Sequence, residues 1–124
     1  MLSQARTHAA IPTADLERAR KFYEGVLGLS PLDATPGGVL YATHGDTRFL
    51  VFPSGGRASG THTQLGFQVD DIGAEVADLK RRGVTFESYE MPGFDAATSI
   101  ATHPGGRSAW FRDPDGNLLG VVQR

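Results

Sequence analysis

The chemistry open to this chain is limited by its side chains, because the sequence contains no cysteine. Disulfides, iron–sulfur clusters, thiolate zinc sites and thiol nucleophiles are therefore excluded. No glycine-rich phosphate loop leads from a strand into a helix, and no recognised local pattern joins a serine, a histidine and an aspartate. His8 is a candidate for acid–base chemistry, because an imidazole can shuttle a proton near neutral pH.

Composition narrows the class of protein further. The 124 residues include 12 basic and 14 acidic side chains, so the formal net charge is −2. The sequence therefore lacks the excess of basic residues that is typical of proteins that bind nucleic acid or an anionic membrane. The first residues contain no apolar run of signal-peptide length, and no stretch approaches the length of a membrane span. We expect a single soluble, cytoplasmic domain that binds neither nucleic acid nor membranes.

Two aspartates mark the starts of helices. Asp15 and Asp71 each precede apolar residues at helical spacing and are interpreted as N-caps. The first helix is expected to end near Val26 and the second before Gly83. The run DPDGN at 113–117 is typical of a turn, because proline and glycine favour the backbone angles that turns require. Elsewhere the pattern predicts short strands at about 7–13, 29–34, 38–43, 47–52, 63–69, 84–91, 107–112 and 117–123.

The chain also resembles itself. A shift of 56 positions places Asp15 on Asp71, and a shift of 71 aligns the later hairpins and places Val39 on Trp110. The difference corresponds to an insertion of about 15 residues in the second half. We therefore expect one domain, 1–124, made of two pseudo-repeat modules at 7–53 and 63–123 that are joined by the linker 53–63.

Two such βαβββ modules have a structural consequence. Each helix covers one face of its curled sheet, and pairing the sheets encloses a cleft between the uncovered faces. Since neighbouring residues of a strand face opposite sides, Leu65 and Phe67 are expected to pack under the helix. Gln64 and Gln68 then face the cleft, and His8 faces it from the first strand.

Three segments of the sequence resemble the vicinal oxygen chelate superfamily: 8–29, 64–86 and 109–122. The superfamily includes glyoxalase I, extradiol dioxygenases, fosfomycin-resistance proteins and bleomycin-binding proteins. The resemblance implies an α+β fold in which two tandem βαβββ modules form a curled mixed sheet around a cleft. It leaves the activity open, because the family includes lyases, epimerases, oxygenases, transferases and plain binding proteins.

The resemblance also implies where a divalent metal ion would bind. His8 and Gln64 stand at the two first-strand ligand positions, and Gly120 stands where a carboxylate normally closes the set. Neither final strand offers an acid, since the 71-residue shift makes Phe49 the counterpart of Gly120. One imidazole and one amide supply no charge to offset the desolvation of the ion. Recruitment of another ligand stays open, with these candidates: His62, Glu87, Glu90 and Asp95.

An aromatic side chain is expected where the metal would lie. If 113–117 is a five-residue hairpin loop, Trp110 lies opposite Gly120 on the same face. We interpret Trp110 as a platform in the cleft, with the glycine-rich insertion 91–106 as a lid. The complete set of expected ligand-binding residues is His8, Tyr41, Phe49, Gln64, Gln68, Tyr89, Met91 and Trp110.

The sequence thus favours a metal-independent protein that holds an aromatic or polyketide-like small molecule and needs no cofactor. The alternative is an enzyme: a glyoxalase-like lyase, an isomerase or a dioxygenase. It would use His8 either with a relocated metal ligand or as an acid–base group. A third possibility is an interaction role with a vestigial cleft. The resemblance implies a homodimer.

Overall fold

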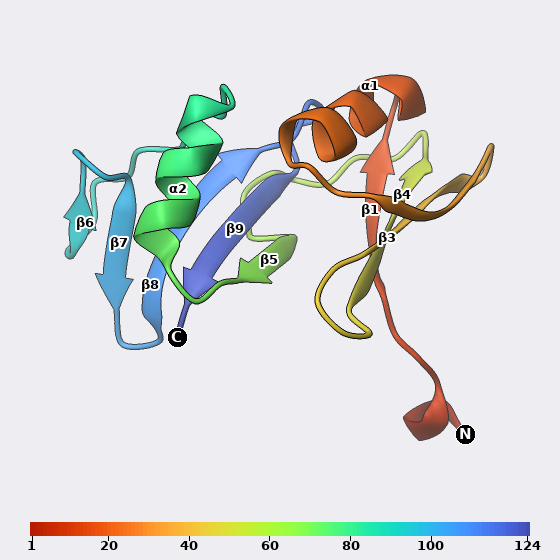
Figure 1. The fold of residues 1–124 in the computed structure, drawn as a ribbon, viewed down its shortest axis with the longest axis horizontal. Coiled ribbons are helices and arrows are strands. Elements are labelled where there is room, and N and C mark those ends of the chain that lie inside the picture. Colours follow the sequence, from red (N-terminus) through yellow and green to blue (C-terminus); the bar gives the residue numbers. More distant parts are fainter. The chain divides into compact units, whose positions relative to one another are not determined.

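The computed structural model describes all residues, 1–124, and the chain divides into two compact units. The first unit is Met1–Arg57 and the second is Ala58–Arg124. Each unit is α+β and contains one open, mixed sheet with a helix against one face (Figure 1). No helix is long and apolar enough to cross a membrane.

The first unit builds a four-stranded sheet in the order β1-β4-β3-β2. The pair β1–β4 is parallel, and the other two pairs are antiparallel. Its elements in chain order are the 3₁₀ turn η1 (Leu2–Gln4), β1 (Ala9–Thr13), α1 (Leu16–Arg20), the π-helical segment η2 (Lys21–Val26), β2 (Pro31–Thr35), β3 (Gly38–Ala42) and β4 (Arg48–Pro53).

The second unit repeats this order of pairings and adds one strand, giving β5-β9-β8-β7-β6. Here β5 runs parallel to β9, and every other pair is antiparallel. Its elements are β5 (Leu65–Gln68), α2 (Ile72–Arg81), β6 (Phe94–Asp95), β7 (Ile100–His103), β8 (Gly106–Arg112) and β9 (Leu118–Gln123).

Both helices begin as the sequence predicts. The Oδ1 atom of Asp15 accepts a hydrogen bond from the Arg18 amide, and Oδ1 of Asp71 accepts one from the Ala74 amide, each at 3.1 Å. These bonds satisfy amides that have no partner inside the helix. The first helix differs from expectation, because it changes to π-helical hydrogen bonding after Arg20.

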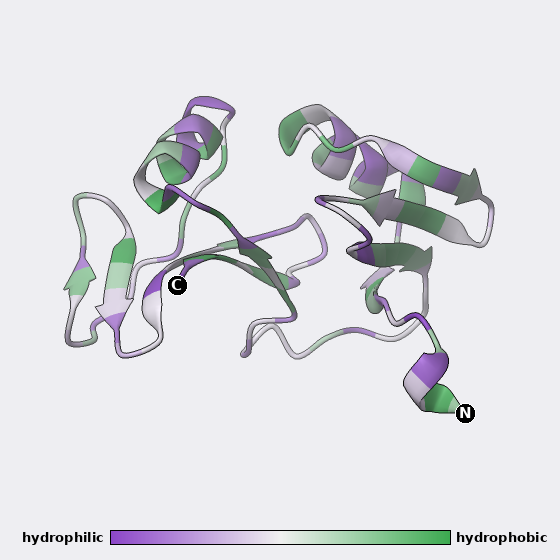
Figure 2. Ribbon diagram, turned by 60° about the horizontal axis from the view of Figure 1, so that its bottom comes forward, coloured by the Kyte–Doolittle hydropathy of each residue, from purple (hydrophilic) through white to green (hydrophobic).

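Each helix packs its apolar residues on the sheet. Figure 2 shows hydrophobic and hydrophilic segments recurring along both helices, the pattern of an element with one buried face. Under α1 and η2 lies an aromatic group, and under α2 lies a mainly aliphatic one. The buried residues of the two cores include Ile11, Ala19, Tyr23, Val39, Tyr41, Phe49 and Val51, and Ile72, Val76, Phe86, Ala109, Phe111, Leu119 and Val121.

The strand expected at 84–91 is wrong. Phe86 makes only an isolated bridge to Phe111, and the rest of the segment has no ladder. The strand that pairs with β8 at this position, β7, instead lies inside the insertion that the sequence suggests is a lid. The turn between β7 and β8 is Pro104–Gly105. At Gly106, where β8 begins, a Cβ would collide with the carbonyl oxygen of Gln123, so this pairing requires a glycine there.

The hairpins of the two units align with a shift of 70 rather than 71. Leu40 pairs with Leu50 where Trp110 pairs with Gly120. Both hairpin loops contain five residues, but the positive-φ glycine is third in one loop and fourth in the other. Aligning the turn glycines therefore misplaces the strands by one residue, which exchanges their two faces.

Candidate functional site

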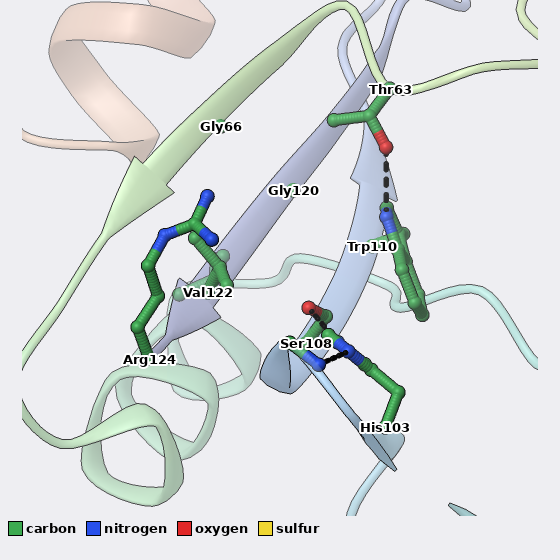
Figure 3. Close-up of a pocket in the computed structure, with 10 residues that line it drawn as sticks. Thr63, Gly66, His103, Ser108, Trp110, Gly120, Val122 and Arg124 are labelled. Atoms are coloured by element: carbon green, nitrogen blue, oxygen red, sulfur yellow. Dashed lines mark hydrogen bonds between the residues drawn. The ribbon is translucent and has the colours of Figure 1, made fainter.

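The uncovered face of the second unit carries a pocket of about 300 Å³. Its floor is the backbone of β5 and β9 at Gly66 and Gly120, and Trp110 of β8 stands at one side (Figure 3). The remaining lining residues are Thr63, His103, Gly105, Ser108, Val121, Val122 and Arg124.

Trp110 is held in a defined orientation at this pocket. It lies opposite Gly120 in the β8–β9 ladder, as the sequence predicts. Its Nε1–H donates to Oγ1 of Thr63 over 3.0 Å (Figure 3). The indole is only partly buried, and a Cβ added at Gly66, which pairs with Gly120, would meet no atom within 4 Å. A flat apolar surface therefore stands beside bare backbone.

A second aromatic ring supports the indole. Tyr89 meets Trp110 edge-on, with ring centroids 5.4 Å apart and an interplanar angle of 88°. Phe94 meets Tyr89 in the same way at 6.2 Å. Met91 is 38% exposed. The structure thus brings Tyr89 to Trp110, but neither Tyr89 nor Met91 contributes to the pocket wall itself.

The other side of the pocket is polar, and sequence reasoning missed its residues. The Gly105 amide donates to Nδ1 of His103 over 3.1 Å, so Nδ1 is the acceptor and Nε2 donates to Oγ of Ser108 over 2.7 Å. Arg124 adds a guanidinium near the end of the chain (Figure 3). The pocket position of Ser108 could have been predicted, because Ser108 and Trp110 are two residues apart on one strand and share a face. The position of His103 could be predicted only if β7 were recognised as a strand.

Thr63, which anchors the indole, lies in a segment fixed by Arg112. Nη1 of Arg112 donates to the carbonyl of Gly60 over 2.9 Å and to that of Gly116 over 3.1 Å. Its Nε forms an ion pair with Glu87. Glu87, one of the candidate replacement ligands for a metal, is therefore engaged by a cation.

Gln68 is the last residue of β5, and Gln64 directly precedes this strand. By strand alternation both lie on the same side as Gly66. The amide N–H of Gln64 donates to the carbonyl of Leu118 over 2.8 Å. Its side-chain Oε1 is buried and has no hydrogen-bond donor. Gln68 is exposed, and neither glutamine lines the pocket.

The uncovered face of the first unit carries a pocket of its own, of about 360 Å³. His8 lies here, with Leu40 of β3 and Leu50 of β4. The complete lining is Arg6, Thr7, His8, Asp33, Thr35, Gly37, Gly38, Leu40, Arg48 and Leu50.

The placement of Tyr41 and Phe49 on the open face is wrong. Both are buried against Tyr23 on the helix-covered face, with centroid distances of 5.8 and 5.7 Å. The physical reason is the one-residue difference in hairpin register, which puts Leu40 and Leu50 on the open face instead.

Tyr41 also belongs to a polar group under the helix. Its hydroxyl donates to Oε2 of Glu24 over 2.9 Å, and Nε of Arg20 donates to the same oxygen over 2.7 Å. Burial, followed by the hydrogen bond to Glu24, raises the pKa of Tyr41. The hydrogen bond from Arg20 lowers the pKa of Glu24, against the opposing effect of burial.

Comparison with known proteins decides the family. Residues 6–121 match the Glyoxalase/Bleomycin resistance protein/Dioxygenase superfamily. The chain belongs to this superfamily. The expected relationship and the α+β fold class are therefore confirmed, although the sheets of this chain are open.

Relatives within the superfamily differ in their named roles. Human mitochondrial methylmalonyl-CoA epimerase is 31% identical over 115 residues, a match that covers 78% of this chain and 65% of the relative's length. Among solved structures, TnmS3, an antibiotic binding protein from Streptomyces sp. CB03234, is 29% identical with a TM-score of 0.72 and covers 97% of this chain and 98% of its own. Lactoylglutathione lyase from Agrobacterium tumefaciens is 26% identical with a TM-score of 0.67, and the coverages are 97% and 93%.

The donor set does not fit the divalent metal ion that the superfamily implies. His8 and Gln64 offer an imidazole and an amide, and Gly120 offers no side chain. A Cβ at Gly120 would stand 3.4 Å from Cδ1 of Trp110, so the indole takes the space beside it. No three His, Asp or Glu side chains gather so that they could hold a metal. Without a carboxylate, nothing offsets the charge of the ion.

Proposed function

We propose that this superfamily member binds a flat, aromatic or polyketide-like small molecule, and that it does so without a metal ion. The observation that carries the proposal is the indole of Trp110 standing beside the bare backbone of Gly66 and Gly120. A planar ligand can stack on the indole while its other parts lie over the two glycines, where no side chain obstructs it.

Three features support this proposal. The pocket volume of about 300 Å³ falls at the lower end of the usual range for small-molecule sites. The indole is already oriented by Thr63 and Tyr89, so little side-chain entropy is lost on binding. Among the solved relatives, TnmS3 is described as an antibiotic binding protein.

The proposal can be tested with the protein's own fluorescence, because Trp110 is its single tryptophan. We would titrate with 2-naphthol as a fused-ring probe and with tetracycline as a polyketide-like probe, with and without EDTA. Saturable quenching that EDTA does not change is the expected result. Calorimetry of Trp110→Leu should show a loss of affinity of about tenfold or more, whereas Phe22→Leu, a matched change in the first unit, should not. Equal binding by both variants, or loss of binding with EDTA, would overturn the proposal.

A second candidate is an enzyme, favoured by the identity of 31% to methylmalonyl-CoA epimerase. The methyl-bearing carbon of methylmalonyl-CoA lies between two carbonyl groups, so its inversion moves a proton at that carbon. His8 is the imidazole that the sequence singles out for acid–base work. Incubation with methylmalonyl-CoA in D₂O, followed by NMR, would detect exchange of that proton. Exchange that is lost in His8→Ala and survives EDTA would establish acid–base catalysis. Exchange that is lost with EDTA would establish catalysis by a metal ion held with a relocated ligand. If no exchange occurs, the enzyme alternative is wrong and the binding function is retained.

A homodimer and a cytoplasmic location complete the proposal. Light scattering of the purified chain tests the first, and a mass of one chain would contradict it. Fractionation of cells that express the native protein tests the second.

A further inference from the structure

The pocket of the first unit combines an apolar floor with a basic rim. Leu40 and Leu50 pair across the β3–β4 ladder and present their side chains to the open face. Arg6 and His8 approach from the segment before β1, and Arg48 approaches from the start of β4. An aliphatic surface with two arginines at its rim matches an organic molecule that has an apolar body and an acidic end.

Arg48 has a buried side-chain donor that lacks a partner. Its Nε is buried and has no acceptor. The nearest carboxylate, that of Asp46, stays 3.9 Å from Nη2, and its side chain is 86% exposed. Leaving a buried guanidinium donor without an acceptor is unfavourable. The Arg48 side chain as a whole is 27% exposed, so the same guanidinium can still reach an anionic oxygen of a ligand.

The side chains that line the pocket carry a net positive charge; Asp46, which pairs with Arg48, lies outside the lining. Arg6 and Arg48 are opposed within the lining only by Asp33, an exposed residue of β2. No ion pair joins Asp33 to either arginine. The rim therefore attracts anions, and the carboxylate of Asp33 weakens that attraction.

We propose that the first unit contains a binding site for small organic carboxylic acids, in which Arg48 binds the carboxylate and Leu40 and Leu50 contact the apolar body. Arg6 and His8 contribute to the rim. This site lies in a different unit from the aromatic pocket of Trp110 and contains none of its lining residues, so the carboxylate proposal and the aromatic-ligand proposal can fail separately. His8 is the one residue that it shares with the enzyme alternative.

Hexanoate is a suitable probe, because its aliphatic chain has no π face to stack on Trp110. Side-chain N–H spectra of ¹⁵N-labelled arginine would follow Arg48, and methyl spectra would follow Leu40 and Leu50, at neutral pH and low ionic strength. The comparison probes are 1-hexanol, which keeps the chain without the charge, and inorganic phosphate, which keeps charge without the chain.

Hexanoate should shift the Arg48 Nε–H and both leucine signals saturably, with an affinity about tenfold or more above that of hexanol. Phosphate should bind more weakly than hexanoate. Equal affinity for hexanol and hexanoate would show that the carboxylate does not contribute to binding. Tighter binding of phosphate than of hexanoate would show that the apolar body does not contribute. Either result would overturn the proposal.

Four variants sharpen the test. Arg48→Gln should weaken hexanoate about tenfold or more, whereas Arg57→Gln, which removes the same charge outside the pocket, should stay within about twofold. Asp33→Asn should tighten binding about two- to threefold, because it removes the opposing charge. If Arg48→Gln does not fold, Arg48→Lys keeps the charge and removes the planar donor pair, and it should still weaken hexanoate. Unchanged affinity in the folded Arg48 variant, or no gain in Asp33→Asn, would contradict the proposal.

Discussion

Trp110 and Gly120 face each other across the β8–β9 ladder, and the indole lies against the glycine. A Cβ at position 120 would stand 3.4 Å from Cδ1 of Trp110 and 3.2 Å from Cγ2 of Thr63. Both separations are at or below ordinary van der Waals contact, so even one methyl group would press on the indole and its hydrogen-bond partner. The orientation of Trp110 therefore depends on the absence of a side chain at position 120.

The first prediction compares two glycine substitutions on this floor. Gly120→Ala should move the indole, shift its emission maximum and weaken binding of 2-naphthol. Gly66→Ala is the matched control for the position of the indole, because the added methyl group would have no neighbour within 4 Å. Its effect on stability should be a gain of about 0.4–1 kcal/mol through the unfolded state. Fluorescence titration and denaturant unfolding measure both effects, and identical spectra for the two variants would contradict the predicted contact.

The second prediction concerns the anchor of the indole. Thr63→Val keeps the shape of the side chain and removes the acceptor for Nε1–H of Trp110. The indole is only partly buried and can then bond to water, so the loss of stability should be no more than about 1 kcal/mol. Binding of the aromatic probe should weaken more than stability does, because the ring is no longer held in one orientation. Time-resolved fluorescence anisotropy should show faster motion of the indole. Unchanged anisotropy would show that Thr63 does not hold the ring.

The sequence is sufficient to predict features that depend on neighbouring residues. Asp15 and Asp71 cap their helices because a carboxylate directly before a helix can accept hydrogen bonds from the unpaired amides of the first turn. The pairing of Trp110 with Gly120 follows from the length of a single hairpin loop. Such local rules need no knowledge of the rest of the chain.

Features that depend on comparing distant segments are less predictable. The turn glycines Gly45 and Gly116 occupy different positions in loops of equal length, so aligning them shifts the strands by one residue and wrongly exposes Tyr41 and Phe49. The polar side of the pocket escapes prediction for a similar reason. His103 reaches it only because β7 pairs with β8, and its segment has the composition of a loop.

The third prediction tests the hairpin register by stability. Phe49→Ala should cost about 3–5 kcal/mol, because the ring is 2% exposed and packs on Tyr23 and Tyr41. Leu50→Ala, one residue along the same strand, should cost clearly less, because its side chain lines an open pocket. Denaturant unfolding of both variants measures the difference. A larger loss for Leu50→Ala would mean that the faces are assigned the wrong way round.

The fourth prediction concerns acid stability. Hydrogen bonding by Arg20 lowers the pKa of Glu24 below its usual 4.5, so the folded state favours the ionised carboxylate. The stability that this contributes is fully present above the unfolded pKa and is lost as the pH falls through the lower folded pKa. Glu24→Gln should therefore be less stable than wild type at neutral pH, and the difference should shrink in acid. Glu90→Gln, at an exposed residue of the second unit, is the control for removing a carboxylate that is not paired with Arg20. A constant difference for Glu24→Gln across the pH range would contradict the linkage.

The fifth prediction concerns metal ions. His8 and Gln64 supply two neutral donors and Gly120 supplies none, so the desolvation of a divalent ion has no negative charge to oppose it. Calorimetric titration with Ni²⁺, Zn²⁺, Mn²⁺ and Fe²⁺ should show no stoichiometric binding at micromolar concentrations, and EDTA should leave the affinity for 2-naphthol unchanged. His8→Ala provides the control for site-specific heat, because any binding by this set must decrease when the imidazole is removed. Stoichiometric micromolar binding that disappears in His8→Ala would mean that a carboxylate from elsewhere completes the site, and the metal-free proposal would then have to be abandoned in favour of a metal-dependent enzyme.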